Sequence, residues 1–327
     1  MARLHGGAAH PKPIRCRQEI TLTFFGIKRK TSSSLGSATQ LPLHRDEGFA
    51  PFFVVGSGRS GNTLLRRLLE AGGQVHIPPE TYVLGPTINL FKQFGTMQWL
   101  DLVHLIYSRF EFHRHFEVFG VSLRPLVLQM INADAGEQSL ALLLDRFFRF
   151  HGQQTGQTGQ RWGDKTPLNS FYLDAIDSVF PDARYIHMVR DGVDVVQSYL
   201  AAGLQTTLED AALRWTQSID AVQSFSATGK DRYLEIHYES LVTDPQKQLK
   251  SACEFLGLSY NPHMIDSNVY AKKNDDVAVF SHHENVRHPV NADSIGKGRR
   301  LLNQKQKSRL QELIGGQLER QGYQPAI

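Results

Sequence analysis

The chain has 327 residues, which is enough to bury an α/β core as one large domain or two small ones. Its formal net charge of +4 is unevenly spread, because residues 1–45 carry eight Lys and Arg against one acid, whereas the remainder has 28 basic and 31 acidic residues. The folded part is therefore not a nucleic-acid-binding domain by bulk charge, and any attraction for a polyanion has to be local.

The compartment is predicted from the cysteines, the hydropathy and the N-terminus. Two cysteines, Cys16 and Cys253, do not make a secreted disulfide framework, and we interpret Cys253 as a small buried hydrophobe. The sequence has no run of about eighteen apolar residues, so we predict no membrane span. The N-terminus lacks the apolar core of a secretory signal. Residues 1–46 are predicted to be a disordered basic extension; an organellar transit peptide and a misassigned start codon remain alternatives. We expect a cytoplasmic protein.

The core begins near Phe49 with the most informative stretch of the chain. Residues 52–55 are predicted to form a buried strand, which a glycine-rich turn joins to a helix near Asn62. The helix start presents free N–H groups and the positive end of its dipole, an arrangement that binds phosphate. The spacing is that of the ATP and GTP loop G-x-x-x-x-G-K-[ST], but Asn62 replaces the lysine, Thr63 follows, and a cation occurs earlier, at Arg59.

Helical and strand-like patterns then alternate along the chain. Residues 86–151 are rich in Phe and Leu with few strand signals, and we interpret them as a helical insertion over the site. The remaining elements are predicted at 64–69 (helix, ended by Gly72 and Gly73), 161–167 (strand-to-helix junction), 183–189 (strand), 193–200 and 208–228 (helices), 233–238 (strand), 247–256 (helix, ended by Gly257) and 304–321 (helix). This alternation indicates an α/β, P-loop-like three-layer fold with a central parallel sheet.

A second polar motif follows the strand at 183–189. Arg190 lies at the carboxyl end of that strand, and Ser198 lies two turns into the next helix. Ligands of open α/β sheets collect at the carboxyl ends of strands. A guanidinium and a hydroxyl at that place can bind one phosphate, the Arg with two parallel hydrogen bonds.

In this order and spacing the two motifs resemble those of the PAPS-dependent sulfotransferases, where PAPS is 3′-phosphoadenosine 5′-phosphosulfate. The resemblance is strongest to the branch with tyrosylprotein sulfotransferases and many bacterial sulfotransferases. It runs from about residue 51 to 297, with weak similarity between about 84 and 160. It implies a sulfotransferase domain at 47–327, PAPS as cofactor, adenosine 3′,5′-bisphosphate as product, and in-line sulfuryl transfer to a hydroxyl or amine acceptor.

The resemblance also implies the cofactor contacts. The 5′-phosphosulfate loop would be formed by Gly58, Arg59, Ser60, Gly61, Asn62 and Thr63, and the 3′-phosphate site by Arg190 and Ser198. Tyr238 matches a family tyrosine near the nucleotide, Val286 and Asn291 lie in a segment similar to the cofactor-covering loop, and Lys297 matches a lysine beyond it. Two departures are Ala202, where the tyrosylprotein branch has an arginine, and His282-His283, where the family has paired serines.

Two residues are predicted to carry the chemistry. Glu80, in a segment that resembles the family's, would be the base that removes the acceptor proton; the alternative is an N-cap or surface acid. Lys165 would neutralise charge on the leaving group; the alternative is a solvated lysine paired with Asp164. Tyr82 stands where the tyrosylprotein branch has an arginine, which argues against a peptide-tyrosine acceptor.

Other functions remain open at this point. A P-loop small-molecule kinase lacks the loop lysine and an evident Mg²⁺-binding strand end, and a non-catalytic nucleotide-binding protein would not need Glu80 and Lys165. No metal is expected, because the histidines at 282–288 and at His113 and His115 lack a tetrahedral ligand spacing. As partners we expect a small-molecule, carbohydrate or peptide acceptor and no nucleic acid, with a homodimer left open.

Overall fold

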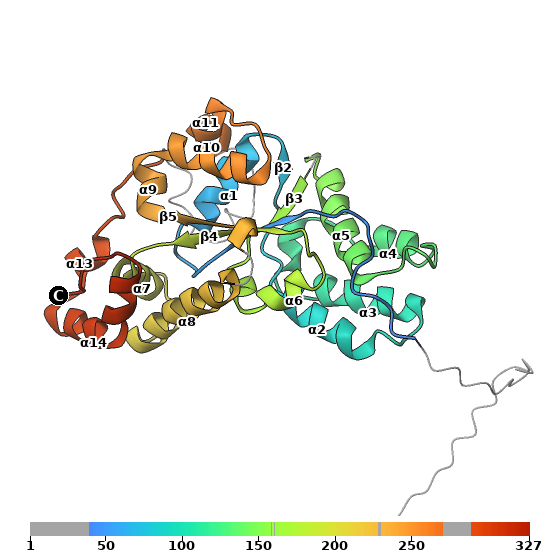
Figure 1. The fold of residues 1–327 in the computed structure, drawn as a ribbon, viewed down its shortest axis with the longest axis horizontal. Coiled ribbons are helices and arrows are strands. Elements are labelled where there is room, and N and C mark those ends of the chain that lie inside the picture. The colour runs from blue at the N-terminus through green and yellow to red at the C-terminus, as the bar shows by residue number, and fades with distance from the viewer. Residues whose placement is uncertain (1–38, 158, 160, 228–229, 271–288) are drawn as a thin grey trace, which may run out of the picture. The chain divides into compact units, whose positions relative to one another are not determined.

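The computed structural model describes residues 39–157, 159, 161–227, 230–270 and 289–327. Within these residues five parallel strands form one sheet in the order β2-β3-β1-β4-β5 (Figure 1). The strands are β1 (Phe52–Val55), β2 (Val75–His76), β3 (Arg161–Asp164), β4 (Arg184–Val189) and β5 (Tyr233–His237). The sheet confirms the predicted α/β fold with a central parallel sheet.

Helices cover the sheet and extend beyond it. The α-helices are α1 (Asn62–Ala71), α2 (Leu84–Phe94), α3 (Trp99–Glu111), α4 (Arg124–Met130), α5 (Leu140–Gln154), α6 (Leu173–Asp177), α7 (Gly192–Ala201), α8 (Leu208–Ser226), α9 (Tyr238–Thr243), α10 (Pro245–Leu256), α11 (Ser267–Tyr270), α13 (Lys297–Leu301) and α14 (Gln304–Arg320). Short 3-10 turns are η1 (Phe116–Phe119), η2 (Pro167–Phe171), η3 (Lys230–Arg232) and η4 (Pro262–Ile265). Figure 1 shows α1, α9, α10 and α11 on one face of the sheet and α6, α7 and α8 on the other.

The central strand β1 is apolar on both faces, as a strand between two helical layers must be. Phe52 and Val54 belong to the core beneath α1 and α10, whereas Phe53 and Val55 belong to the core shared with α2, α3 and α5. All four side chains are fully buried. The alternation of one strand between two cores explains why the sequence reads as a continuous apolar run and why the sheet lies in the middle layer.

The predicted helical segment at 86–151 corresponds to α2, α3, α4 and α5 in the structure. Part of the predicted extension packs against this group: Leu41 N donates to Gly95 O (2.8 Å), and Ala141 N donates to Leu43 O (2.8 Å). Residues 39–46 therefore belong with the folded part, because their backbone groups pair with helix ends. For residues 1–38, the extension stays a prediction.

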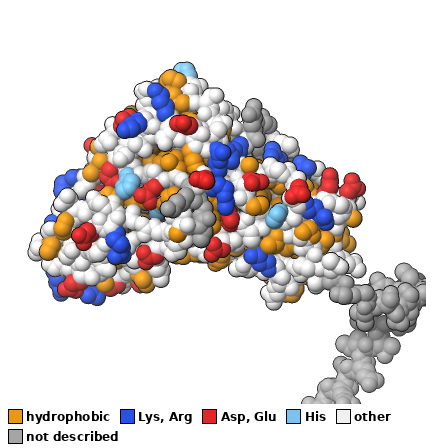
Figure 2. Space-filling view, in the orientation of Figure 1, with side chains coloured by type: hydrophobic (Ala, Val, Ile, Leu, Met, Phe, Trp, Pro, Cys, Tyr) orange, Lys and Arg blue, Asp and Glu red, His pale blue; other side chains and the backbone are white. Residues whose placement is uncertain are grey.

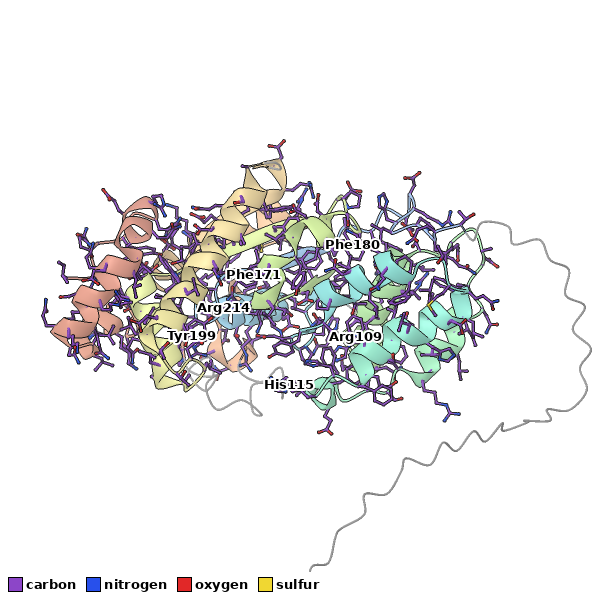
Figure 3. All side chains as sticks on the ribbon, turned by 90° about the horizontal axis from the view of Figure 1, so that it is seen from below. Arg109, His115, Phe171, Phe180, Tyr199 and Arg214 are labelled. Carbon is purple, nitrogen blue, oxygen red and sulfur yellow. The ribbon has the colours of Figure 1, made fainter. Side chains whose placement is uncertain are left out.

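The short turn η2 connects β3 to α6. The guanidinium of Arg214 on α8 lies 4.6 Å from the ring centre of Phe171 in η2, and Figure 3 shows the two side chains together. On the face shown in Figure 2, Lys and Arg side chains are interspersed with Asp and Glu, which agrees with the nearly balanced charge after residue 45. The positive charges that bear on function are therefore to be sought at a local site.

Candidate active site

The carboxyl ends of the described strands all lead into the predicted site residues. β1 runs into the loop at 56–61, β3 into Lys165, β4 into Arg190 and β5 into Tyr238, while the segment after β2 carries Glu80. Because the strands are parallel, these ends lie at one edge of the sheet, where α/β proteins bind ligands. The parallel topology thus gathers residues that are up to 182 positions apart in the sequence, from Gly56 to Tyr238.

The loop after β1 has the geometry of an anion cradle. Gly56 adopts φ 129° and its N–H donates to Ser170 Oγ (2.9 Å), while Gly61 adopts φ 93° at the N-cap of α1. No side chain caps the first turn of α1, so its N–H groups remain available to an anion. The hydroxyl of Ser60 is buried without a hydrogen-bond partner among the described residues.

Asn62, at the position of the nucleoside-triphosphate lysine, is used inside the loop. Its Nδ2 donates to the carbonyl of Ser57 (2.8 Å), and the side chain is 3% exposed. The amide therefore braces the cradle and brings no positive charge to it. The neighbouring Thr63 accepts a hydrogen bond from Lys165 Nζ (3.1 Å), so a lysine reaches the loop from β3 instead.

Arg59 points toward the second polar motif, which consists of Arg190 and Ser198. With φ 68° it is one of two described non-glycine residues at positive φ, and its Nε donates to Ser198 Oγ (3.0 Å). Arg190 Nη1 donates to the carbonyl of Arg59 (3.1 Å). Burial, followed by the charge of Arg190, lowers the pKa of Arg59. The loop and the Arg190–Ser198 pair therefore form one continuous cationic region.

Arg190 is held from several sides. Its guanidinium lies 4.4 Å from the ring centre of Tyr238, and Trp215 Nε1 donates to its carbonyl (3.1 Å). A Cβ on Gly61 would lie 2.5 Å from the Tyr238 ring, so the glycine permits this packing. The Nε of Arg190 is buried without a hydrogen-bond partner in the described part of the chain. A rigid, partly unsatisfied guanidinium is suited to receiving an anion.

Glu80 and Lys165 form an ion pair next to the cradle. Lys165 Nζ contacts Glu80 Oε1, and the exposed fractions of the two side chains are 1% for Lys165 and 15% for Glu80. The alternative roles do not match this geometry, because the N-cap of α2 is Val83 and Asp164 bonds elsewhere. The ammonium therefore lies between a carboxylate and Thr63, at the end of the cradle.

The carboxylate of Asp164 accepts two short hydrogen bonds, from Thr81 Oγ1 (2.6 Å) and Thr166 Oγ1 (2.6 Å). Burial raises the pKa of Asp164 to about 6, partly offset by these hydroxyl donors. Asp164 and Lys165 are neighbours in sequence, yet only the ammonium bonds to Glu80. At the end of β3, Asp164 therefore binds Thr81 and Thr166, whereas Lys165 contacts Glu80.

The remaining predicted contacts are on the surface or outside the described residues. Asn291 is exposed, and its side chain accepts from Asp293 N (3.1 Å). Lys297 is exposed and begins α13. Val286 lies outside the described residues. Contacts of these three residues with a cofactor therefore stay predictions.

Asp194 is a residue of the candidate site that the sequence motifs did not reveal. Its two carboxylate oxygens accept from Gly296 N (2.8 Å) and Gly298 N (2.7 Å), and one lies 3.7 Å from Arg190 Nη2. Arg190 Nη2 also donates to Ser294 O (2.9 Å). Asp194 therefore ties the segment at 294–298 to Arg190. Its spacing of four residues from Arg190 was a usable signal.

Tyr199 was missed as well. Its hydroxyl lies 3.4 Å from Ser57 Oγ, and a Cβ on Gly58 would lie 2.6 Å from the same hydroxyl. Tyr199 comes from α7 and is labelled in Figure 3. It packs against the cradle because Gly58 has no side chain. In the sequence this tyrosine reads only as part of an apolar helix face.

Tyr82 lies two residues after Glu80 and contacts the helical region. It adopts φ 55°, and its ring lies 5.4 Å from that of His113 and 5.3 Å from that of His115. Burial, followed by the charge of His115, lowers the pKa of His113. The segment before α2 and the turn after α3 thus meet through these rings.

In the part of the chain that is described, no group of three His, Cys, Asp or Glu is arranged to hold a metal.

Comparisons with known proteins identify the family. The family model described as "Sulfotransferase family" matches residues 51–262. "Protein-tyrosine sulfotransferase 1" of Danio rerio is 26% identical over 301 residues, covering 89% of this chain and 77% of the relative. An omega-hydroxy-beta-dihydromenaquinone-9 sulfotransferase of Mycobacterium tuberculosis is 26% identical over 255 residues, covering 64% of this chain and 63% of the relative.

Among solved structures, the sulfotransferase domain from the Synechococcus PCC 7002 olefin synthase superposes with a TM-score of 0.56 at 22% identity. The superposition covers 82% of this chain and 96% of that domain. At this identity the likeness concerns the fold, and it supports the P-loop-like arrangement of sheet and helices.

The comparisons also correct the expected location. The prediction of a cytoplasmic protein is wrong. The matched relatives include several protein-tyrosine sulfotransferases, and this match gives no support to a cytoplasmic location. The prediction rested on the lack of a signal, an apolar run and a cysteine framework, and none of these defines a compartment. In the structure, no helix of the described residues is both long and apolar enough to span a bilayer.

Proposed function

The chain belongs to the PAPS-dependent sulfotransferase family, and we propose that it transfers the sulfuryl group of PAPS in line to a hydroxyl or amine acceptor, with Glu80 as base and Lys165 at the leaving group. The observation that carries this proposal is the Glu80–Lys165 ion pair beside the phosphate cradle. A base and a cation within contact distance at the end of an anion site are what acid–base-assisted group transfer requires.

The residues present fit a doubly phosphorylated nucleotide. Ser60 Oγ and Arg190 Nε are buried donors without partners in the described chain, and the first turn of α1 has no side-chain cap. We propose that the loop at 58–63 holds the 5′-phosphosulfate and that Arg190 and Ser198 hold the 3′-phosphate. Arg59 serves both, because its Nε already reaches Ser198.

When bound, PAPS supplies an activated sulfuryl group on a phosphate leaving group. The chain's part is to orient that group and to stabilise the charge that develops on the leaving oxygen. We assign this role to Lys165, because its ammonium contacts both Thr63 at the cradle and Glu80. We assign the removal of the acceptor's proton to Glu80.

The kinase alternative is not favoured by the loop. Nucleoside-triphosphate loops bring a lysine to the terminal phosphates, whereas the amide of Asn62 donates to the carbonyl of Ser57.

The acceptor remains a proposal: a hydroxyl or amine on a small molecule, carbohydrate or peptide. A screen of such acceptors with radiolabelled PAPS identifies it.

Two substitutions test the proposed chemistry. Glu80→Gln should lower turnover by about 10²–10⁴-fold with nearly unchanged PAPS affinity, because the amide keeps the size of the side chain but cannot act as a base. Lys165→Ala should lower turnover and also raise the Kd for PAPS, because its ammonium acts on the bound cofactor as well. Radiolabel transfer gives turnover, and calorimetry gives affinity.

Glu117→Gln is the matched control for the base, because Glu117 is an exposed carboxylate on η1. It should keep the turnover of the native protein. Native turnover in Glu80→Gln with an alkyl alcohol acceptor would place the base elsewhere.

A further inference from the structure

The residue after Glu80 is anchored by a closed set of hydrogen bonds. Thr81 N donates to Thr166 Oγ1 (2.9 Å), Thr81 Oγ1 donates to Asp164 Oδ2 (2.6 Å), and Thr166 Oγ1 donates to Asp164 Oδ1 (2.6 Å). The three side chains are at most 2% exposed. One buried carboxylate at the end of β3 therefore satisfies both hydroxyls, and through Thr166 the backbone N–H of Thr81 is satisfied as well.

The other end of the same segment is anchored to α1. Ile77 N donates to Glu70 Oε1 (3.0 Å), and Arg66 Nε donates to Ile77 O (2.9 Å). Arg66 and Glu70 form an ion pair at 3.4 Å, and both are 2% exposed. Glu80 thus lies in a short span between two anchored residues, Ile77 and Thr81. Pro78 and Pro79 stiffen the first half of this span.

We propose that Thr81, Asp164 and Thr166 are positioning residues that hold the Glu80 carboxylate against Lys165. The inference rests on the base role of Glu80 proposed above. Asp164 immediately precedes Lys165, so one strand end fixes both the segment that carries the carboxylate and the ammonium that it contacts.

A carboxylate at position 164 suits this anchor for a geometric reason. It offers two acceptor oxygens, so both threonine hydroxyls donate to it and the lone pairs of Thr166 Oγ1 are free to accept from Thr81 N. An amide offers one acceptor oxygen and forces one hydroxyl to reverse. The hydrogen-bond directions are thus set by the carboxylate, and with them the backbone at Thr81.

Thr81→Val removes one hydroxyl and keeps the shape of the side chain. With water as acceptor and radiolabelled PAPS as donor, we expect kcat to fall about 10–100-fold, as for a small displacement of a catalytic group. The KM for PAPS should stay unchanged. Thr87→Val is the control: Thr87 is fully buried on α2, and its hydroxyl has no hydrogen-bond partner among the described residues. This variant should keep native kcat.

A double variant separates positioning from stability. If Thr81 acts through Glu80, adding Thr81→Val to Glu80→Gln should change kcat by less than about twofold. An additional loss as large as in the native background would overturn the inference and leave the base role intact. Native turnover in Glu80→Gln alone would instead remove the base role, and with it the function assigned to the anchor.

A structural readout is independent of turnover. In crystal structures of both threonine variants, the Lys165 ammonium should no longer reach the Glu80 carboxylate in Thr81→Val, whereas the ion pair should persist in Thr87→Val. An intact Glu80–Lys165 ion pair in Thr81→Val contradicts positioning.

Discussion

At the scale of single residues, the site contrasts two adjacent charged groups. Lys165 bonds to Glu80 and Thr63, whereas Asp164 bonds to hydroxyls. An ionised carboxyl that is taken out of water and meets only neutral donors is disfavoured relative to its protonated form. The cost of the buried carboxylate should therefore be visible in the pH dependence of stability.

Asp164→Asn tests this cost. The pKa of Asp164 lies near 6 in the folded chain against an ordinary value of 3.8, so between these pH values the folded state holds a proton that the unfolded chain has lost. Its contribution to stability is complete below about pH 4 and declines, by about 3 kcal/mol at most, as pH rises through 6. Denaturant unfolding from pH 4 to pH 7 should show this decline in the native chain and a flatter profile in Asp164→Asn. Parallel profiles would contradict the assignment.

At the scale of elements, the junction of β1 with α1 depends on where glycine allows close packing. Gly61 caps α1 in the left-handed region and lies against Tyr238, the first residue of α9. That ring in turn supports Arg190. The cradle, the end of β5 and the end of β4 are therefore coupled through one contact.

Gly61→Ala should weaken the binding of adenosine 3′,5′-bisphosphate, because the added Cβ would lie 2.5 Å from the ring of Tyr238 and displace it from Arg190. Gly73→Ala is the matched control, since Gly73 has φ 74° but nothing within 4 Å of a Cβ. Both should lose about 1–2 kcal/mol of stability to the left-handed backbone, whereas only Gly61→Ala should raise the Kd in calorimetry. Equal Kd values would show that Tyr238 is not coupled to the nucleotide site.

At the scale of the whole molecule, charge is nearly balanced after residue 45 and is concentrated where function needs it. The parallel sheet brings Arg59, Lys165 and Arg190 to one edge. A ligand with two phosphate groups should therefore stabilise the folded protein more than a ligand with one.

Adenosine 3′,5′-bisphosphate should raise the Tm of the native protein well above the shift produced by AMP at equal concentration. Arg190→Ala should reduce the larger shift to about that of AMP, because a charge-assisted contact worth about 1.5–3 kcal/mol is removed. The shift with AMP should be nearly unchanged in the variant. Thermal unfolding measures both, and equal shifts for the two ligands in the native protein would contradict separate phosphate contacts.

The local motifs explain how much was predictable. The apolar run at 52–55, the glycine loop and the strand before Arg190 each depend on neighbours in sequence, so they predicted the parallel α/β fold and the edge that carries the site. Glu80 and Lys165 were predicted from family resemblance, and the structure brings them into contact. The compartment was predicted wrongly, because the sequence offered only missing signals.

The tertiary structure decided the contacts between residues that are far apart in the chain. The reach of Arg59 to Ser198, the anchoring of Thr81 by Asp164, and the packing of Tyr82 on His113 join positions 139, 83 and 31 residues apart. No local pattern encodes such pairs, since a side chain's partner depends on which strand ends the sheet order places together. The sequence alone determined the fold class and the kinds of groups at the site. Their partners were decided by a parallel sheet that brings all its carboxyl ends to one edge.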